Sequence, residues 1–338
     1  MASPVIEDID FLLLPSSTRS TIAICRSALH KGVRVDGRSI KEFRNIDIEL
    51  LRKPGHAIVS FGNTKVFVAI SAEVVAPNLE RPNEGVISFN LEMSPMCSKS
   101  YEPNRQTDTE KKMCHTIEKV FKDSGAVDVE SLCISAGKYV WCIRVKLRVV
   151  QDDGNVLDVC SVAALVGLGC FKKPETIATN EHIQSVKVDS SYLSPLKLYH
   201  TPILVSIGIL RNSEINIVDT SRFEANVVET YVTLLFNQFG DLFFIQKNGG
   251  LGIPLQRINE VIALGKNTAI NMHEAIAAQM RRFSNMDANK VKFRLRQDLR
   301  PVEEGLVINV PSEITALRRN SVFIVTLSYV PLGMCRKN

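Results

Sequence analysis

The sequence predicts an α/β (α+β) protein of two similar halves, each with strands followed by helices. From Trp141 to Val149, apolar side chains alternate with a set made up of Cys142 and three cations, which indicates a half-buried strand, because side chains on a strand point in turn to its two faces. The segment 156–169 is rich in small residues and suits a helix packed closely against a sheet. Strands followed by a long helix recur, without shared words, between residues 184 and 283.

The strand predicted from Trp141 onward has two unlike faces. Its charged face carries Arg144, Lys146 and Arg148. The simplest interpretation is a core strand with a solvated basic face, and a binding role for that face stays open. The apolar face carries Trp141, Ile143, Val145, Leu147 and Val149.

Upstream, the chain predicts a leader, a helix and a meander of strands. Residues 1–16 are irregular, and Ser17 or Thr18 caps a helix that stops at Gly32. Turn residues separate the alternating runs that follow, which favours antiparallel pairing. These runs span 44–51, 56–61, 65–75 and 86–93.

A helix from Thr107 to Asp123 is predicted by its capping box. The hydroxyl of Thr107 suits a first-turn amide, and Glu110 stands three residues later to reach back to it. Cations spaced three and four residues apart form a basic ridge along one side of this helix, because such residues are neighbours on a helix surface. The ridge consists of Lys112, His115, Lys119 and Lys122.

The second half begins with a linker at 176–183 and ends in a long amphipathic helix that opens at Pro254 and reaches Phe283. The glycine cluster at 249–252 lacks the spacing of a nucleotide-binding loop, so we assign it to a turn. The later runs 307–310 and 322–327 are typical of strands. Between the linker and the helix we expect strands at 184–189, 203–210, 214–218, 231–237 and 242–247.

Composition indicates a globular protein. The chain has 338 residues, of which 45% are hydrophobic, and a net charge of +5. Residues 281–300 hold seven Lys and Arg against two Asp, so the rest of the chain is formally neutral and any affinity for a polyanion must come from local clusters of cations. The eight cysteines show no metal-ligand spacing, and we interpret them as reduced core residues. We expect no metal site, no cofactor, no signal peptide and no membrane span.

Several long sequence segments resemble segments of the RNase PH-like subunits of the eukaryotic RNA exosome ring, and they occur in the same order as in that family. The resemblance covers about residues 18–283 and favours the branch of the polymyositis/scleroderma autoantigen, a non-catalytic partner type. The segments are RVDGRSIKEFRNIDIEL (34–50), VSFGNTKVFVAISAEVVAP (59–77), EGVISFNLEMSPM (84–96), EPNRQTD (102–108), DVESLCISAGKYVWCIRVKLRVVQDDGNVLDVCSVAAL (128–165) and FKKPE (171–175).

The resemblance implies an RNase PH-like fold in a six-membered ring that RNA threads, and it argues against catalysis by this chain. Active members hold phosphate on a loop where a glycine precedes Thr or Ser and Arg, and here that loop reads Gly154-Asn155-Val156. Their two catalytic aspartates correspond to Ser194 and His200, which cannot replace a pair of metal-binding carboxylates. An arginine pair of active members is reduced to Arg105-Gln106. The expectation is a subunit that is not an enzyme.

The candidate RNA-binding residues are Arg105, His115 and Lys119, which match a basic channel-facing segment of the archaeal non-catalytic partner, and the weaker candidate Arg81. Each is equally compatible with a solvated charge or a subunit salt bridge. The implied function is structural and RNA-binding, in support of 3′-to-5′ RNA processing and degradation, including rRNA processing. An active phosphate-dependent exoribonuclease and a pure protein scaffold are the alternatives.

The resemblance also implies partners, location and domains. The partners are the other RNase PH-like ring subunits, cap subunits with RNA-binding domains, single-stranded RNA and an associated hydrolytic nuclease. The expected location is the nucleus and nucleolus, and also the cytoplasm. The expected domains are an N-terminal leader and helix (1–30), the first half (31–180), the second half (181–285) and a basic C-terminal extension of unassigned role (286–338).

Overall fold

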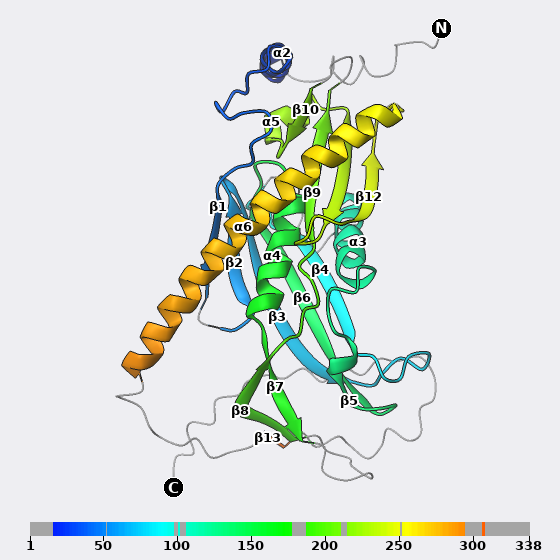
Figure 1. Cartoon of the computed structure of the whole chain (residues 1–338), viewed down its shortest axis with the longest axis vertical. Helices are drawn as coiled ribbons and strands as arrows, with labels where there is room; N and C mark the ends of the chain where they lie inside the picture. Colours follow the sequence, from blue (N-terminus) through cyan, green and yellow to red (C-terminus); the bar gives the residue numbers. More distant parts are fainter. Residues whose placement is uncertain are drawn as a thin grey trace.

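The structure, a computed structural model, describes residues 16–51, 53–97, 101, 106–177, 187–210, 215–250, 252–294 and 306–307. Its centre is a six-stranded sheet of order β1-β2-β3-β6-β4, with β5 paired to β6 (Figure 1). Neighbouring strands are antiparallel except β4 and β6, which are parallel. The strands are β1 (Ile46–Leu50), β2 (His56–Phe61), β3 (Thr64–Val75), β4 (Val86–Met93), β5 (Cys133–Ser135) and β6 (Tyr139–Gln151).

The second half is a four-stranded sheet followed by a long helix, as the sequence predicts. Its strand order is β10-β9-β11-β12, and all neighbours are antiparallel. Figure 1 shows the helix α6 (Leu255–Arg294) crossing this sheet and continuing past β1. The strands are β9 (Ile203–Ile209), β10 (Asn216–Val218), β11 (Thr230–Phe236) and β12 (Leu242–Asn248).

The helix α4 (Val156–Cys170) lies between the two sheets and joins them into one core. It packs against β2, β3 and β6 on one side and against β9 on the other. Gly167 permits the close approach, because a methyl group there would meet Val68 Cγ2 at 2.9 Å and Ile70 Cδ1 at 3.1 Å. The helix is buried along most of its length and most of its residues are apolar, which is typical of a helix between two layers.

The remaining helices cover the outside of the sheets. The helix α3 (Asp108–Lys122) packs against β4, and α2 (Ser16–His30) packs against the short helix α5 (Arg222–Ala225) beside the second sheet. A second, smaller apolar cluster fills the space under α2 with Ile22, Cys25, Leu29, Leu210, Ile217, Val227 and Val228.

A small third sheet corrects one expectation of the sequence. Residues Thr176 and Ile177 do not open a linker, because they end β7 (Lys172–Ile177), which pairs with β8 (Lys187–Pro195). The partner strand follows later in the chain, so local composition gave no sign of it. The rest of that linker, 178–186, lies outside the described residues.

Two expected boundaries near the C-terminus have different outcomes. The helix α6 continues past residues 285 and 286, between which the sequence predicts a domain boundary. The division of the chain into domains stays a prediction. Of the predicted strand at 307–310 only residue 307 is described, in β13 (Leu306–Val307), which pairs with β8. The run 322–327 lies outside the described residues.

Candidate nucleic-acid interface and the catalytic positions

The helix α3 is fixed to the edge of the first sheet at both its start and its buried face. The capping box is present, with Thr107 Oγ1 accepting from Glu110 N and Glu110 Oε2 accepting from Thr107 N. The other oxygen of the Glu110 carboxylate accepts from Met93 N at 2.9 Å, which ties the helix to the end of β4. Phe121 stacks on Phe89 of β4 with ring centroids 5.3 Å apart.

The opposite face of α3 presents cations to solvent. Lys112, His115 and Lys119 are exposed, and none of the three has an ion-pair partner among the residues that the structure describes. Lys122, the fourth cation of the ridge, pairs with Glu118 at 2.5 Å. The helix therefore holds one row of available positive charge, which suits contact with successive phosphates.

The other candidate RNA-binding residues are not joined to this row. Arg81 is exposed and pairs with Glu84 at 3.1 Å. Its loop is bound to the β5–β6 hairpin, because Pro82 O accepts from Gly137 N, and Figure 1 shows this region near β5, away from the start of α3. Arg105 lies outside the described residues.

The basic face of β6 is largely neutralised within the fold. Arg144 pairs with Glu73 at 3.1 Å, and Arg148 pairs with Glu92 at 2.8 Å. Lys146 is exposed and has no ion-pair partner in the described part of the chain. The alternation predicted for this strand is confirmed, but two of its three cations are offset by carboxylates of neighbouring strands.

The loop between β6 and α4, where the resemblance predicts the place of a phosphate loop, is held by contacts inside the chain. Gly154 and Asn155 have positive φ of 91° and 53°. Thr64 Oγ1 donates to Gly154 O at 2.8 Å, and Arg44 donates to the same oxygen from Nη2 at 3.0 Å. A methyl group on Gly154 would meet Thr220 O at 2.6 Å, so the second half of the chain closes over this loop.

Asp219 is the centre of the ion network that joins the two halves. The side chain is buried and accepts from the backbone N and the guanidinium of Arg44, from Arg38 and from Asn155 Nδ2. Burial alone raises the pKa of Asp219, but the bonds from Arg44 and Asn155 outweigh it and hold the pKa below its ordinary value. Arg34 lies beside this centre, with a paired bond to Glu224 at 2.6 and 2.9 Å.

Ser194 and His200, which are predicted to stand at the places of the catalytic aspartates, are engaged in contacts within the chain. The imidazole of His200 stacks on Phe243, with ring centroids 5.2 Å apart and an interplanar angle of 1°. Burial lowers the pKa of His200, and its Nε2 is buried without a hydrogen-bond partner in the described part of the chain. Ser194 Oγ donates to Lys173 O at 3.4 Å.

Sequence reasoning missed two charged residues near the loop. Arg222 is exposed, and its backbone N donates to Asp153 O at 3.1 Å, so this residue of the second half stands beside the loop. Burial raises the pKa of Tyr101 and of Cys97, and the charge of Arg222 opposes both shifts. No local signal connects residue 222 with residue 153, because this contact exists only in the folded chain.

The second missed residue is Asp158, in the first turn of α4. Its carboxylate accepts from Ser206 Oγ at 2.7 Å and from Ser206 N at 2.8 Å, which links α4 to β9. Burial raises the pKa of Asp158 to about 7, and the bonds from Ser206 oppose that shift. The residue sits within an apolar run of the sequence, where an acidic side chain gives no indication of its partner.

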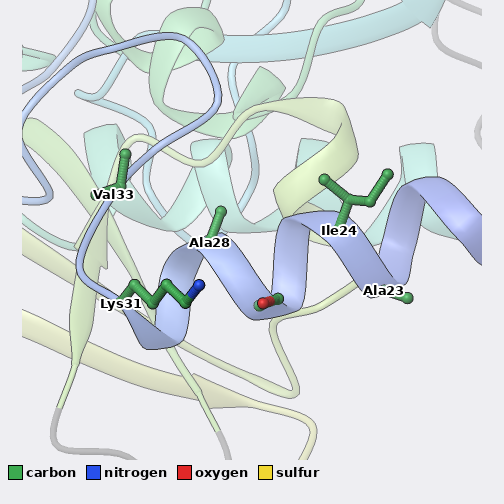
Figure 2. A pocket seen from close by; sticks show the side chains of 6 residues that line it. Ala23, Ile24, Ala28, Lys31 and Val33 are labelled. Atoms are coloured by element: carbon green, nitrogen blue, oxygen red, sulfur yellow. The ribbon is translucent and has the colours of Figure 1, made fainter.

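The part of the chain that the structure describes shows neither a metal cluster nor a membrane-spanning helix. The described residues contain no cluster of three or more His, Cys, Asp or Glu side chains arranged to hold a metal ion. Their helices include none with the length and apolar character needed to cross a bilayer. Figure 2 shows a shallow depression on α2, where Ala23, Ile24, Ala28 and Val33 surround an open surface beside Lys31. Its lining is mainly aliphatic, so it gives no sign of a polar ligand.

Comparison with known proteins identifies the fold and the relatives. Residues 42–174 match the family described as "3′ exoribonuclease family, domain 1". The chain is 35% identical over 224 residues to the exosome complex component RRP45 of Bos taurus, covering 66% of this chain and 51% of that protein. It is 32% identical over 232 residues to rrp45 of Schizosaccharomyces pombe, covering 69% of this chain and 80% of that protein. The chain thus spans about half the length of its mammalian relatives.

Solved structures give the same answer for the fold. A chain of the Archaeoglobus fulgidus exosome, in a structure described as having RNA bound to the active site, superposes with a TM-score of 0.68 at 26% identity, over 77% of this chain and 99% of that one. A chain of an archaeal exosome core superposes with a TM-score of 0.64 at 26% identity, over 80% and 99%. The expected RNase PH-like fold is confirmed, and this chain belongs to the RNase PH-like family of exosome components of the RRP45 type.

Proposed function

We propose that this chain is a non-catalytic, RNA-binding subunit of the RNase PH-like ring of the RNA exosome, and that it supports 3′-to-5′ RNA processing and degradation. Its partners in this proposal are other RNase PH-like ring subunits, cap subunits with RNA-binding domains, single-stranded RNA and an associated hydrolytic nuclease. The nucleus, the nucleolus and the cytoplasm are the proposed locations. Support comes from relatives that are named exosome complex components and from the likeness to archaeal exosome chains.

The observation that carries the non-catalytic assignment is the use of the catalytic positions for packing. His200 stacks on Phe243 where active relatives place a carboxylate. The corresponding phosphate loop has its Gly154 carbonyl bound by Arg44 and Thr64. An imidazole whose pKa is lowered by burial is neutral at pH 7 and supplies no negative charge for a divalent metal.

A phosphorolysis assay tests this assignment. The chain, alone and paired with its RNase PH-like neighbour, is incubated with RNA, inorganic phosphate and Mg²⁺, and released nucleoside diphosphates are measured. We expect no release from the chain alone, and none from the pair when the catalytic carboxylates of the neighbour are replaced by amides. Release that persists in that variant pair would identify this chain as an active exoribonuclease.

RNA contact is assigned to the exposed row Lys112, His115 and Lys119 on α3. These side chains are three and four residues apart and so line up along one side of the helix. Contacts from such a row to RNA phosphates do not depend on the base sequence, which suits a channel that accepts any RNA. Arg105, which precedes this helix in the sequence, stays a proposed RNA-binding residue. Arg81 is the weaker candidate, because Glu84 already offsets its charge.

Charge reversal on the helix separates RNA contact from a scaffold role. In the reconstituted ring, Lys112→Glu with Lys119→Glu is expected to abolish ultraviolet crosslinking of RNA to this chain. Lys146→Glu, an exposed cation on the open face of the first sheet, is the matched control and should leave crosslinking unchanged. Intact crosslinking in the double variant would favour the pure scaffold.

A further inference from the structure

The strand β12 is an unpaired edge of the second sheet. It pairs with β11 along one side, from Tyr231 opposite Asn248 to Phe236 opposite Leu242, and no described strand lies along its other side. Figure 1 shows β12 at the margin of the molecule. Large apolar side chains of this strand are exposed: Phe243 at 49%, Ile245 at 46% and Leu242 at 39%.

The other edges of the two main sheets are protected in ways that β12 is not. The strand β10 has three residues, and Val218 N donates to Ile40 O outside the sheet. On β1, Ile46 O accepts from Gln279 of α6. On β4, Met93 N donates to Glu110 of α3. In the described part of the chain, no hydrogen bond from outside its sheet reaches the backbone of β12.

The composition of β12 is unusual for an exposed edge. Edge strands are commonly blunted by charges, proline or a covering segment, because their free N–H and C=O groups attract further strands. Here the sequence is Leu-Phe-Phe-Ile-Gln-Lys-Asn, and its one charge, Lys247, is bonded through Nζ to Gly249 O and Gly250 O. An edge with a single cation offers little to an RNA backbone, whereas its uncharged apolar side chains complement another apolar strand.

We propose that β12 pairs with an edge strand of a neighbouring RNase PH-like subunit, so that the four-stranded sheet continues across the subunit boundary. The inference rests on the proposed ring function and names the surface through which one ring contact is made. The stacked ring of His200 fixes the orientation of Phe243 at one end of this edge. The position that carries a carboxylate in active relatives thus supports an assembly contact in this chain.

Hydrogen–deuterium exchange tests the proposal without a mutation. The chain is measured alone and after reconstitution with recombinant RNase PH-like subunits from the same genome. We expect the amides of 242–248 to exchange rapidly in the isolated chain and to gain at least tenfold protection in the assembly. Unchanged exchange of these amides in a ring whose mass is complete would overturn the proposal and leave the ring function intact. Failure of any ring to form would instead contradict the proposed function.

A substitution provides the second test. Ile245→Lys places a charge on the edge, and we expect at least a tenfold loss of affinity for the neighbouring subunit in native mass spectrometry. Leu79→Lys, at an equally apolar side chain that is 98% exposed in a loop, is the control and should assemble normally. Ile245→Val should also assemble normally, which distinguishes a blocked edge from a misfolded sheet. Normal assembly of Ile245→Lys would contradict the proposal.

Discussion

At the scale of residues, the ion network around Asp219 holds the two halves of the chain together. Arg34, Arg38 and Arg44 come from the segment before β1, whereas Asp219 and Glu224 come from the second half. Removing one member of a buried ion pair leaves a charge without compensation, and that loss exceeds any gain from the pair itself. The network also fixes the loop at Gly154, because Arg44 bonds to Asp153 O and Gly154 O.

Asp219→Asn tests the network with little change of shape. Asparagine tolerates the positive φ of 51° at this position, so the backbone should not be strained. We expect the free energy of unfolding to fall by about 3 kcal/mol or more, because Arg44 loses its buried counter-charge. Urea unfolding measures this change. The control Glu84→Gln, which breaks an exposed pair with Arg81, should change stability by less than about 1 kcal/mol.

Asp158→Asn tests a dependence of stability on pH. The folded pKa of about 7 lies above the unfolded value of about 4, so between these pH values the folded chain binds one proton more than the unfolded chain. The contribution of this group to the free energy of unfolding is therefore greatest below about pH 4 and is lost as the pH rises to about 7. We expect the variant, whose amide stays neutral, to gain stability relative to the natural chain over this range in urea unfolding. A constant difference from about pH 4.5 to 7.5 would contradict the shift.

At the scale of elements, the sequence predicted the features that depend on residues close together in the chain. The capping box of α3, the alternation of β6 and the small residues of α4 each follow from neighbours in the chain, and the structure confirms all three. The prediction that a linker starts at Thr176 was wrong, because Thr176 and Ile177 belong to β7, whose partner β8 follows later in the chain. Ion pairs could not be predicted from the local sequence for the same reason. The side chains of Arg144 and Arg148 share the charged face of β6, but their partners Glu73 and Glu92 lie on neighbouring strands.

Two glycines of α4 separate helix propensity from packing. A methyl group at Gly169 meets no atom within 4 Å, whereas one at Gly167 meets Val68 Cγ2 at 2.9 Å. We expect Gly169→Ala to stabilise the chain by about 0.5–1 kcal/mol through propensity alone. Gly167→Ala should destabilise it by about 1–2 kcal/mol, because the helix must move away from β3. Thermal unfolding of both variants measures the effects, and equal shifts of the same sign would contradict the close packing of α4.

At the scale of the whole molecule, one buried helix and one crossing helix connect the two sheets. The helix α4 packs between them, and α6 runs from the second sheet to the first, where Gln279 Nε2 donates to Ile46 O at 2.7 Å. Available cations on the outside are unevenly placed: the row on α3 is exposed, whereas two of the three cations on β6 are paired. RNA and subunit contacts are thereby assigned to different surfaces, α3 and the β12 edge.

The salt dependence of RNA affinity follows from this placement. Each phosphate contact to single-stranded nucleic acid releases bound counterions and contributes about 0.7 to the slope of log affinity against log salt. Replacing Lys112 and Lys119 by glutamine removes two such contacts, so we expect the slope of the assembled ring to decrease by about 1.4 in fluorescence anisotropy titrations with oligonucleotide. Lys146→Gln should leave the slope unchanged, because that cation faces away from α3 on the sheet. An unchanged slope in the double variant would place RNA on a surface other than α3, whereas a decreased slope with β12 still protected would show that the two contacts are independent.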